Sequence, residues 1–196
     1  MADAHTTREA WLLAATQLLR PMLDEVGAPE VDYTKIRVTM GFPSVRAMSM
    51  TAPRIGECWP KSSSADEATE IMISPRLAAP VQVLDTLLHE LCHAVLPPGA
   101  GHKAPFVKLA RALGMEGKPT ATFAGPALKT KLEGLAGQLG ALPHGAITGG
   151  SGSKKQSTRM LKCLCKECGY TVRLSAKWLE VGPPICPTDE LTMVEG

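Results

Sequence analysis

The segment Thr86-Leu87-Leu88-His89-Glu90-Leu91-Cys92-His93-Ala94-Val95 contains the pattern His-Glu-x-x-His, around which the expected fold is built. In a helix, this spacing places the imidazoles of His89 and His93 one turn apart on one face, as two zinc ligands require. Glu90 follows the first histidine by about 100° of helix rotation, so its carboxylate borders the metal without binding it. There it can take a proton from a water molecule whose pKa the ion lowers to about 7. The pattern therefore predicts a catalytic zinc site with Glu90 as general base.

The flanking residues support a helix and suggest a third ligand. Apolar residues recur every three to four positions around the two histidines, and Pro80 suits the first turn of a helix. Pro97-Pro98-Gly99 ends the helix, because proline cannot continue its hydrogen bonds. The glycine-rich turn that follows lets the chain come back, which makes His102 the candidate third zinc ligand. His102 lies nine residues after His93, whereas the metzincin pattern has six, so that subclass is a poor match.

The remaining elements of the first 142 residues predict an α+β domain. Apolar periodicity predicts an N-terminal helix over 7–25, a second amphipathic helix over 106–113 and a weaker one over 126–139. Alternating patterns predict a short three-stranded sheet from residues 36–40, 54–59 and 69–73. Residues 115–119 are expected to form a turn. We expect residues 1–142 to form a zincin-like core, followed by a flexible Gly/Ser/Lys-rich linker over 143–158.

The C-terminal residues 159–196 predict a small β module of the zinc-ribbon kind. Cys165-x-x-Cys168-Gly forms a tight turn whose thiolates can face one zinc ion, and Cys186 follows after a seventeen-residue spacer. The spacer is expected to form a hairpin from residues 170–174 and 178–181. A full ribbon would end in Cys-Pro-x-Cys, whereas this chain ends in Cys186-Pro187-Thr188-Asp189. The fourth ligand is therefore Asp189, or Cys163, or no ligand at all if the module folds without metal.

The charge distribution suggests a partner for this module. From Ser151 to Trp178 the chain carries seven basic residues against Glu167 alone, while the whole protein has a net charge of only +2. Basic residues interleaved with Tyr170 and Trp178 suit contact with the phosphates and bases of DNA. The alternative is a solvated lysine-rich linker with two aromatics that form the core of the hairpin.

The composition bears on where the protein is located and on what its cysteines bind. The longest apolar run is far shorter than the ~20 residues that span a bilayer, and residues 1–5 lack the layout of a signal peptide. We therefore expect a cytoplasmic protein without a membrane partner. In that compartment six cysteines, three of them between Cys163 and Cys168, are expected to bind metal before they form disulfides.

The sequence resembles the SprT-like metallopeptidases, which include the Spartan proteases. The likeness rests on His89-Glu90-Leu91-Cys92-His93-Ala94 followed by Gly101-His102-x-x-x-Phe106 and on the cysteine-containing tail. It covers roughly residues 80–110 and 160–190. Spartan proteases degrade proteins crosslinked to DNA, and the resemblance implies that this chain is a zinc metalloendopeptidase that acts on DNA-associated proteins. Two rival interpretations are a nucleic-acid-binding accessory protein with a structural zinc core and a metal-dependent hydrolase that acts on something other than peptides.

Overall fold

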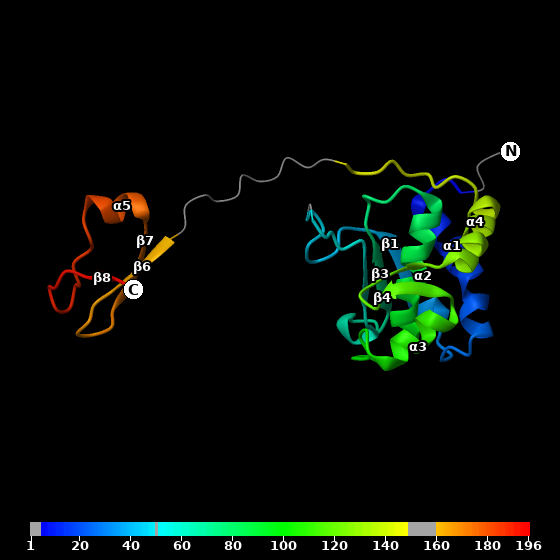
Figure 1. The fold of residues 1–196 in the computed structure, drawn as a ribbon, viewed down its shortest axis with the longest axis horizontal. Coiled ribbons are helices and arrows are strands. Elements are labelled where there is room, and N and C mark those ends of the chain that lie inside the picture. The colour runs from blue at the N-terminus through cyan, green and yellow to red at the C-terminus, as the bar shows by residue number, and fades with distance from the viewer. Residues whose placement is uncertain (1–4, 50, 149–159) are drawn as a thin grey trace. The chain divides into compact units, whose positions relative to one another are not determined.

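A computed structural model describes residues 5–49, 51–148 and 160–196 (Figure 1). The chain divides into two compact units, Met1–Thr148 and Gly149–Gly196, called here the first and second unit. The described residues contain five α-helices and three small sheets, so the chain is a mixed α+β protein, as the sequence predicts. Within these residues, no helix combines the length and the apolar character needed to cross a bilayer.

The first unit contains a three-stranded sheet with strand order β1-β3-β2. Strand β1 (Ile36–Met40) runs parallel to the central strand β3 (Thr69–Ile73), and β2 (Gly56–Trp59) runs antiparallel to it. All three strands were predicted, although β2 begins two residues later than expected. Ile71 and Ile73 are fully buried on the face that packs against the helices. Because β3 is the central strand, β2 lies at an edge of this sheet.

Four helices of the first unit surround a common core: α1 (Arg8–Glu25), α2 (Pro80–Val95), α3 (Ala104–Ala112) and α4 (Pro126–Leu139). Helix α2 lies at the centre, in contact with α1, α3, α4, β2 and β3. Its apolar stripe is fully buried, at Val83, Leu84, Leu87, Leu88 and Leu91. Each such side chain contributes roughly 1.5–3 kcal/mol on burial. The apolar residues around the two histidines thus fix α2 as the centre of the core.

A hairpin follows α3 where the sequence predicts only a turn. Strand β4 (Met115–Lys118) pairs with β5 (Ala121–Ala124), and Met115 is buried. Gly117 has a φ of +86°, and a Cβ on it would lie 2.7 Å from the Phe123 ring. The Arg111 guanidinium donates hydrogen bonds to the carbonyls of Met115 and Gly117. The prediction was wrong because these tertiary contacts, and not an alternating apolar pattern, hold the two short strands.

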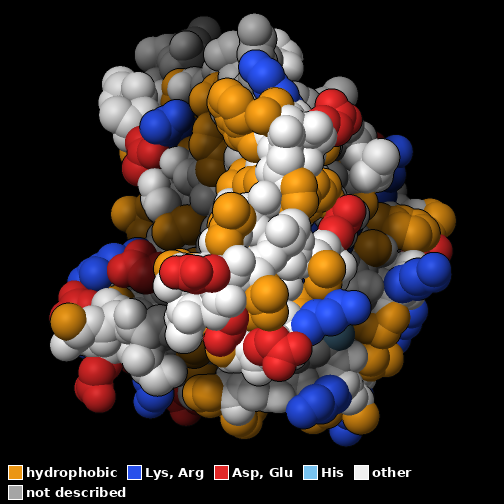
Figure 2. Space-filling view, turned by 90° about the vertical axis from the view of Figure 1, so that its left-hand side faces the viewer, with side chains coloured by type: hydrophobic (Ala, Val, Ile, Leu, Met, Phe, Trp, Pro, Cys, Tyr) orange, Lys and Arg blue, Asp and Glu red, His pale blue; other side chains and the backbone are white. Residues whose placement is uncertain are grey.

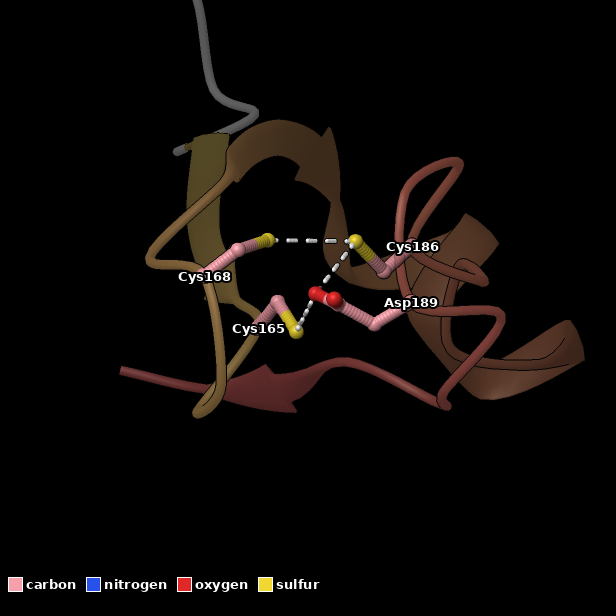
Figure 3. Close-up of side chains that lie close together, drawn as sticks. All are labelled: Cys165, Cys168, Cys186 and Asp189. Atoms are coloured by element: carbon pink, nitrogen blue, oxygen red, sulfur yellow. Dashed lines mark hydrogen bonds between the residues drawn. The ribbon is translucent and has the colours of Figure 1, made fainter.

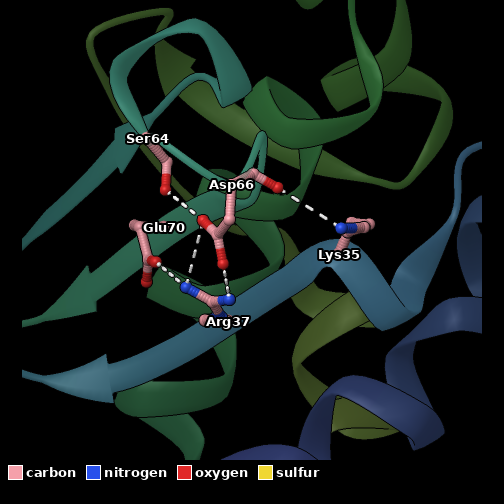
Figure 4. A network of polar contacts seen from close by, with 5 residues as sticks. All are labelled: Lys35, Arg37, Ser64, Asp66 and Glu70. Carbon is pink, nitrogen blue, oxygen red and sulfur yellow. Dashed lines mark hydrogen bonds and ion pairs between the residues drawn. The ribbon is translucent and has the colours of Figure 1, made fainter.

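An exposed polar network ties β1 to β3 and to the loop before β3 (Figure 4). The Arg37 guanidinium donates to Asp66 and, at 2.9 Å, to Glu70, its cross-strand partner in the sheet register. Ser64 donates to Asp66, and Lys35 donates to the Asp66 carbonyl. The Ser64 hydroxyl and the Arg37 guanidinium hold the pKa of Asp66 below its ordinary value. This network supports the register of β1.

The segment predicted as a linker is described in part. Residues 143–148 belong to the first unit and are held there, since the Ile147 amide donates to the Pro75 carbonyl at 2.8 Å. A ring nitrogen of His144 donates to the same carbonyl at 2.9 Å. The rest of the predicted linker, residues 149–158, lies outside the described residues.

The second unit contains a three-stranded sheet of order β7-β6-β8, made by β6 (Met160–Leu164), β7 (Thr171–Ser175) and β8 (Val194–Glu195). Residues 178–181, predicted as the returning strand of a hairpin, lie in helix α5 (Ala176–Val181) instead. The predicted pairing was wrong because β7 pairs with β6, across the turn formed by the first cysteine pair. The buried core of the second unit consists of Cys163, Cys165, Cys186 and Met193.

Candidate metal centres

The three histidines predicted as ligands come together in the first unit. The Nε2 atom of His102 lies 3.2 Å from the Nε2 of His93 and 3.3 Å from that of His89. Tetrahedral zinc with Zn–N bonds of about 2.0–2.1 Å places its ligand nitrogens roughly 3.3–3.4 Å apart. A neutral imidazole carries only one ring proton. Three Nε2 atoms that converge therefore carry more lone pairs than hydrogen bonds among the three rings can satisfy. The spacing of these nitrogens therefore fits one metal ion.

The surroundings keep these imidazoles neutral, as metal ligands must be. Burial, with the neighbouring imidazoles, lowers the pKa of His89 to about 3 and that of His93 to about 4. The pKa of His102 is lowered by burial and by the Arg54 guanidinium. All three rings also pack against the fully buried Phe106 of α3, which lies parallel to His93 with ring centres 4.4 Å apart. Phe106 thus holds the turn that carries His102 against α2.

A threonine that sequence reasoning missed contacts the first histidine. The Oγ1 atom of Thr122, on β5, lies 2.7 Å from the Nδ1 of His89. Histidine ligands of metals commonly use their second ring nitrogen for such a hydrogen bond, which fixes the orientation of the ring. No local motif marks Thr122, because it lies 33 residues from His89 in the sequence.

Glu90 lies buried beside the histidines, where α2 packs against β2. A Cβ on Gly56 would lie 2.9 Å from the Glu90 Cγ and 2.8 Å from the Thr86 Cγ2, so only glycine leaves room for the Glu90 side chain. Burial raises the pKa of Glu90 to about 8; Arg54 acts against this shift and Glu57 acts with it. The carboxyl group can therefore hold a proton near neutral pH. The sequence showed no signal for Gly56 beyond its place in a predicted strand.

Near this site a second carboxylate, that of Glu57, orients the Arg54 guanidinium. Glu57 is almost fully buried and accepts hydrogen bonds from the Ser44 amide and hydroxyl at 2.7 Å and from the Trp59 indole at 3.1 Å. It also forms an ion pair with Arg54. Arg54, Glu57, Glu90 and the three histidines line one cleft of about 1530 Å³. This cleft is large enough for a segment of polypeptide as well as for a small molecule.

The second unit gathers four further ligand groups: Cys165, Cys168, Cys186 and Asp189 (Figure 3). The Cys168 and Cys186 sulfurs lie 3.5 Å apart, and the Asp189 Oδ2 lies 3.2 Å from the Cys165 sulfur and 3.4 Å from the Cys186 sulfur. Tetrahedral zinc with sulfur at about 2.3 Å and oxygen at about 2.0 Å gives roughly 3.8 Å and 3.5 Å for such pairs. The spacing is that of a four-coordinate metal site, slightly contracted.

Two similar turns build this cluster. The Gly169 amide donates to the Cys165 carbonyl at 3.0 Å, and the Glu190 amide donates to the Cys186 carbonyl at 2.9 Å. Gly169 and Glu190 both have left-handed backbones, with φ of +75° and +55°. Asp189 therefore occupies in the second turn the position that Cys168 occupies in the first. Of the two alternatives for the fourth ligand, the structure brings Asp189 into the cluster, whereas the buried Cys163 is not among its members.

Comparison of the chain with models of protein families, with curated proteins and with solved structures gave no match. The two candidate metal centres thus rest on the geometry described above.

Proposed function

We propose that the first unit is a zinc-dependent peptidase of the SprT-like kind, with a zincin-like core. The observation that carries the proposal is the convergence of three neutral imidazoles at Nε2 separations of 3.2–3.3 Å, with the buried Glu90 carboxyl beside them. A structural zinc site has four protein ligands, whereas three ligands leave a position open for catalysis. A site that served structure alone would also have no use for a buried Glu90.

In this proposal each residue has a separate task. His89, His93 and His102 would hold the zinc ion, which polarises a peptide carbonyl and acidifies water. Glu90 would accept a proton from the attacking water at its carboxylate and give it to the leaving amine. Burial raises the pKa of Glu90, and a bound zinc ion would act in the opposite direction by favouring the carboxylate, the form that accepts the proton. Arg54 is a cation in the same cleft that Glu57 keeps in place.

The sheet offers a place for an extended substrate. Strand β2 pairs with β3 on one side and has no partner among the described strands on the other. Its first residue, Gly56, contacts Glu90, so β2 borders the cleft. An extended peptide can add to such an edge through backbone hydrogen bonds, which are independent of its side chains. We therefore expect broad side-chain tolerance in the substrate.

Replacing Glu90 tests the peptidase proposal. Glu90→Gln should retain one zinc ion in the first unit and lose about 10²–10⁴-fold in casein hydrolysis, the usual contribution of a general base. Glu133→Gln, an exposed change on α4, serves as the matched control and should cleave casein as wild type does. The same casein digests are also run with a chelator and with DNA. Zinc-loaded wild type that leaves casein intact with and without DNA would contradict the proposal and favour a metal-dependent hydrolase of other substrates.

We propose that the second unit uses its zinc for structure and contacts DNA. Tyr170 and Trp178 are 46% and 58% exposed, and the Lys177 ammonium lies 5.3 Å from the centre of the Trp178 ring. Exposed aromatics beside a cation suit stacking on unpaired bases. The described residues of this unit carry four basic and five acidic side chains; Lys154, Lys155 and Arg159 lie outside them. The space-filling view in Figure 2 is not confined to this unit and shows basic, acidic and hydrophobic side chains interspersed.

Binding of a fluorescent single-stranded oligonucleotide tests this contact. Trp178→Ala should weaken binding by roughly 5- to 150-fold, which corresponds to the 1–3 kcal/mol of one stacked base. The exposed Trp59 of the first unit supplies the control Trp59→Ala, which should bind as wild type does. Equal affinity of wild type and Trp178→Ala would contradict the proposal. We propose a cytoplasmic location, because none of the six cysteines forms a disulfide in the structure.

A further inference from the structure

The β4–β5 hairpin contacts the metal-bearing face of α2 at two points. Thr122 Oγ1 lies 2.7 Å from His89 Nδ1. Burial raises the pKa of the Asp85 carboxyl, and the backbone amide of Ala124 lies near enough to Asp85 to lower that pKa. Asp85 and His89 are one helical turn apart, a rise of about 6 Å, and Thr122 and Ala124 are two residues apart in a strand, about 6.8 Å. These repeats nearly match, so β5 runs antiparallel along α2 with Thr122 at the level of the first ligand.

The Thr122 hydroxyl has two polar neighbours, the Met115 sulfur and the His89 Nδ1 atom. It donates toward the buried Met115 sulfur, with 3.6 Å between Oγ1 and Sδ. Its oxygen is then free to accept a hydrogen bond, and in this arrangement the donor is the Nδ1–H of His89. A neutral imidazole with its proton on Nδ1 has its lone pair on Nε2. That Nε2 atom points at His102, from whose Nε2 it lies 3.3 Å.

From these contacts we propose that Thr122 is a positioning residue for the first metal centre. It holds His89 in the Nδ1–H tautomer and fixes the plane of the ring, so that Nε2 faces the ion. The β4–β5 hairpin is thereby part of the metal site, although it contributes no ligand. The inference rests on the histidine metal centre of the proposed function and does not depend on peptide hydrolysis.

Zinc affinity, measured by competition with a chelator, tests the role of the hydroxyl. Thr122→Val keeps the shape of the side chain and removes its oxygen, and it should weaken zinc binding about 10- to 100-fold, as for other residues that orient histidine ligands. Thr122→Ser keeps the oxygen and should bind zinc within about threefold of wild type. Thr120→Val, in the exposed turn of the same hairpin, should leave the affinity unchanged. Wild-type affinity in Thr122→Val would overturn the proposal.

The tautomer gives a readout that a change in stability alone would not move. Long-range ¹H–¹⁵N spectra of the metal-free protein should show His89 as the Nδ1–H tautomer in wild type and in Thr122→Ser, and as a mixture in Thr122→Val. A wild-type His89 protonated at Nε2 would overturn the proposal, and this measurement on wild type decides the matter if Thr122→Val does not fold. Wild type that binds no zinc at the three histidines would overturn this proposal together with the peptidase, whereas zinc binding without peptide hydrolysis would refute the peptidase alone.

Discussion

At the residue scale, the absence of a side chain at Gly56 decides where the Glu90 carboxyl lies. Gly56 opens β2, and its Cα faces the α2 residues Glu90 and Thr86. Any other residue would add a Cβ at 2.8–2.9 Å from carbon atoms of both side chains, closer than van der Waals contact allows. Glu90 is held in a rigid helix and buried, so it cannot swing into solvent without leaving the cleft.

We therefore expect Gly56→Ala to shift Glu90 while the histidines keep their places. The overpacked contact should cost about 1–3 kcal/mol of unfolding free energy, measured by urea denaturation. Casein hydrolysis should fall with retention of stoichiometric zinc. Gly134→Ala is the control, because nothing lies within 4 Å of the added methyl group on α4 and the change should stabilise by up to ~1 kcal/mol. Wild-type stability and activity in Gly56→Ala would show that the contact is easily relieved.

The residues that could be predicted are those whose role depends on local spacing. His89, Glu90 and His93 lie within five residues of one helix, and His102 lies on the turn that follows it. Gly56 and Thr122 reach the same site through the packing of β2 and β5 on α2, and sequence separation hides such contacts. Asp189 could be predicted as a ligand because it follows Cys186 by three residues, as Cys168 follows Cys165. Only the fold shows that Asp189, and not Cys163, joins the cluster.

At the scale of the element, α2 carries ionisable groups whose pKa values shift in opposite directions. Burial lowers the pKa of His89 from 6.5 to about 3 and that of His93 to about 4, and it raises the pKa of Glu90 from 4.5 to about 8. Below about pH 6.5 the unfolded chain binds more protons at the two histidines than the folded chain does, so their contribution to stability is lost on acidification. Between about pH 4.5 and 8 the folded chain binds more protons at Glu90, so its contribution is lost as pH rises.

These opposing shifts predict the pH dependence of the metal-free protein. Urea unfolding in the presence of chelator should show wild type losing stability on both sides of an intermediate pH, because the histidines act on the acid side and Glu90 on the alkaline side. Glu90→Gln should remove the alkaline loss and keep the acid one. Glu133→Gln, at an exposed position, should reproduce the wild-type curve. An alkaline loss of the same size in Glu90→Gln would assign it to another group.

Elements with strong periodicity were predictable, and those held by tertiary contacts were not. Helix α2 and strands β1 and β3 carry apolar residues at the spacing of their own secondary structure, because they face one core. Strands β4 and β5 have little buried apolar area beyond Met115 and depend on Arg111 and on Gly117. Apolar and polar side chains alternate only weakly over residues 176–181. Because β7 pairs with β6, these residues are not its partner strand, and they form α5.

At the scale of the molecule, we expect the two units to depend on metal to different degrees. The first unit has an extensive aliphatic core around α2, whereas the buried core of the second unit consists of Cys163, Cys165, Cys186 and Met193. Two of these four are candidate ligands, so a bound ion would replace most of the missing apolar core. We therefore expect a chelator to unfold the second unit and to leave the first unit folded. Amide spectra should then lose the dispersed signals of residues 160–196 and keep those of the first unit.

The fourth ligand of the second unit provides the sharpest test of this difference. Asp189→Ala removes a carboxylate that lies 3.2 Å and 3.4 Å from two cysteine sulfurs, and it should weaken zinc binding by this unit at least about tenfold. Asp189→Cys completes a four-cysteine site and should bind zinc at least as tightly as wild type. Cys163→Ala leaves the cluster intact and should keep zinc affinity while it lowers stability by about 1 kcal/mol, because it removes only a small buried side chain. Chelator competition on the full chain measures all three, and loss of zinc in Cys163→Ala but not in Asp189→Ala would reverse the assignment.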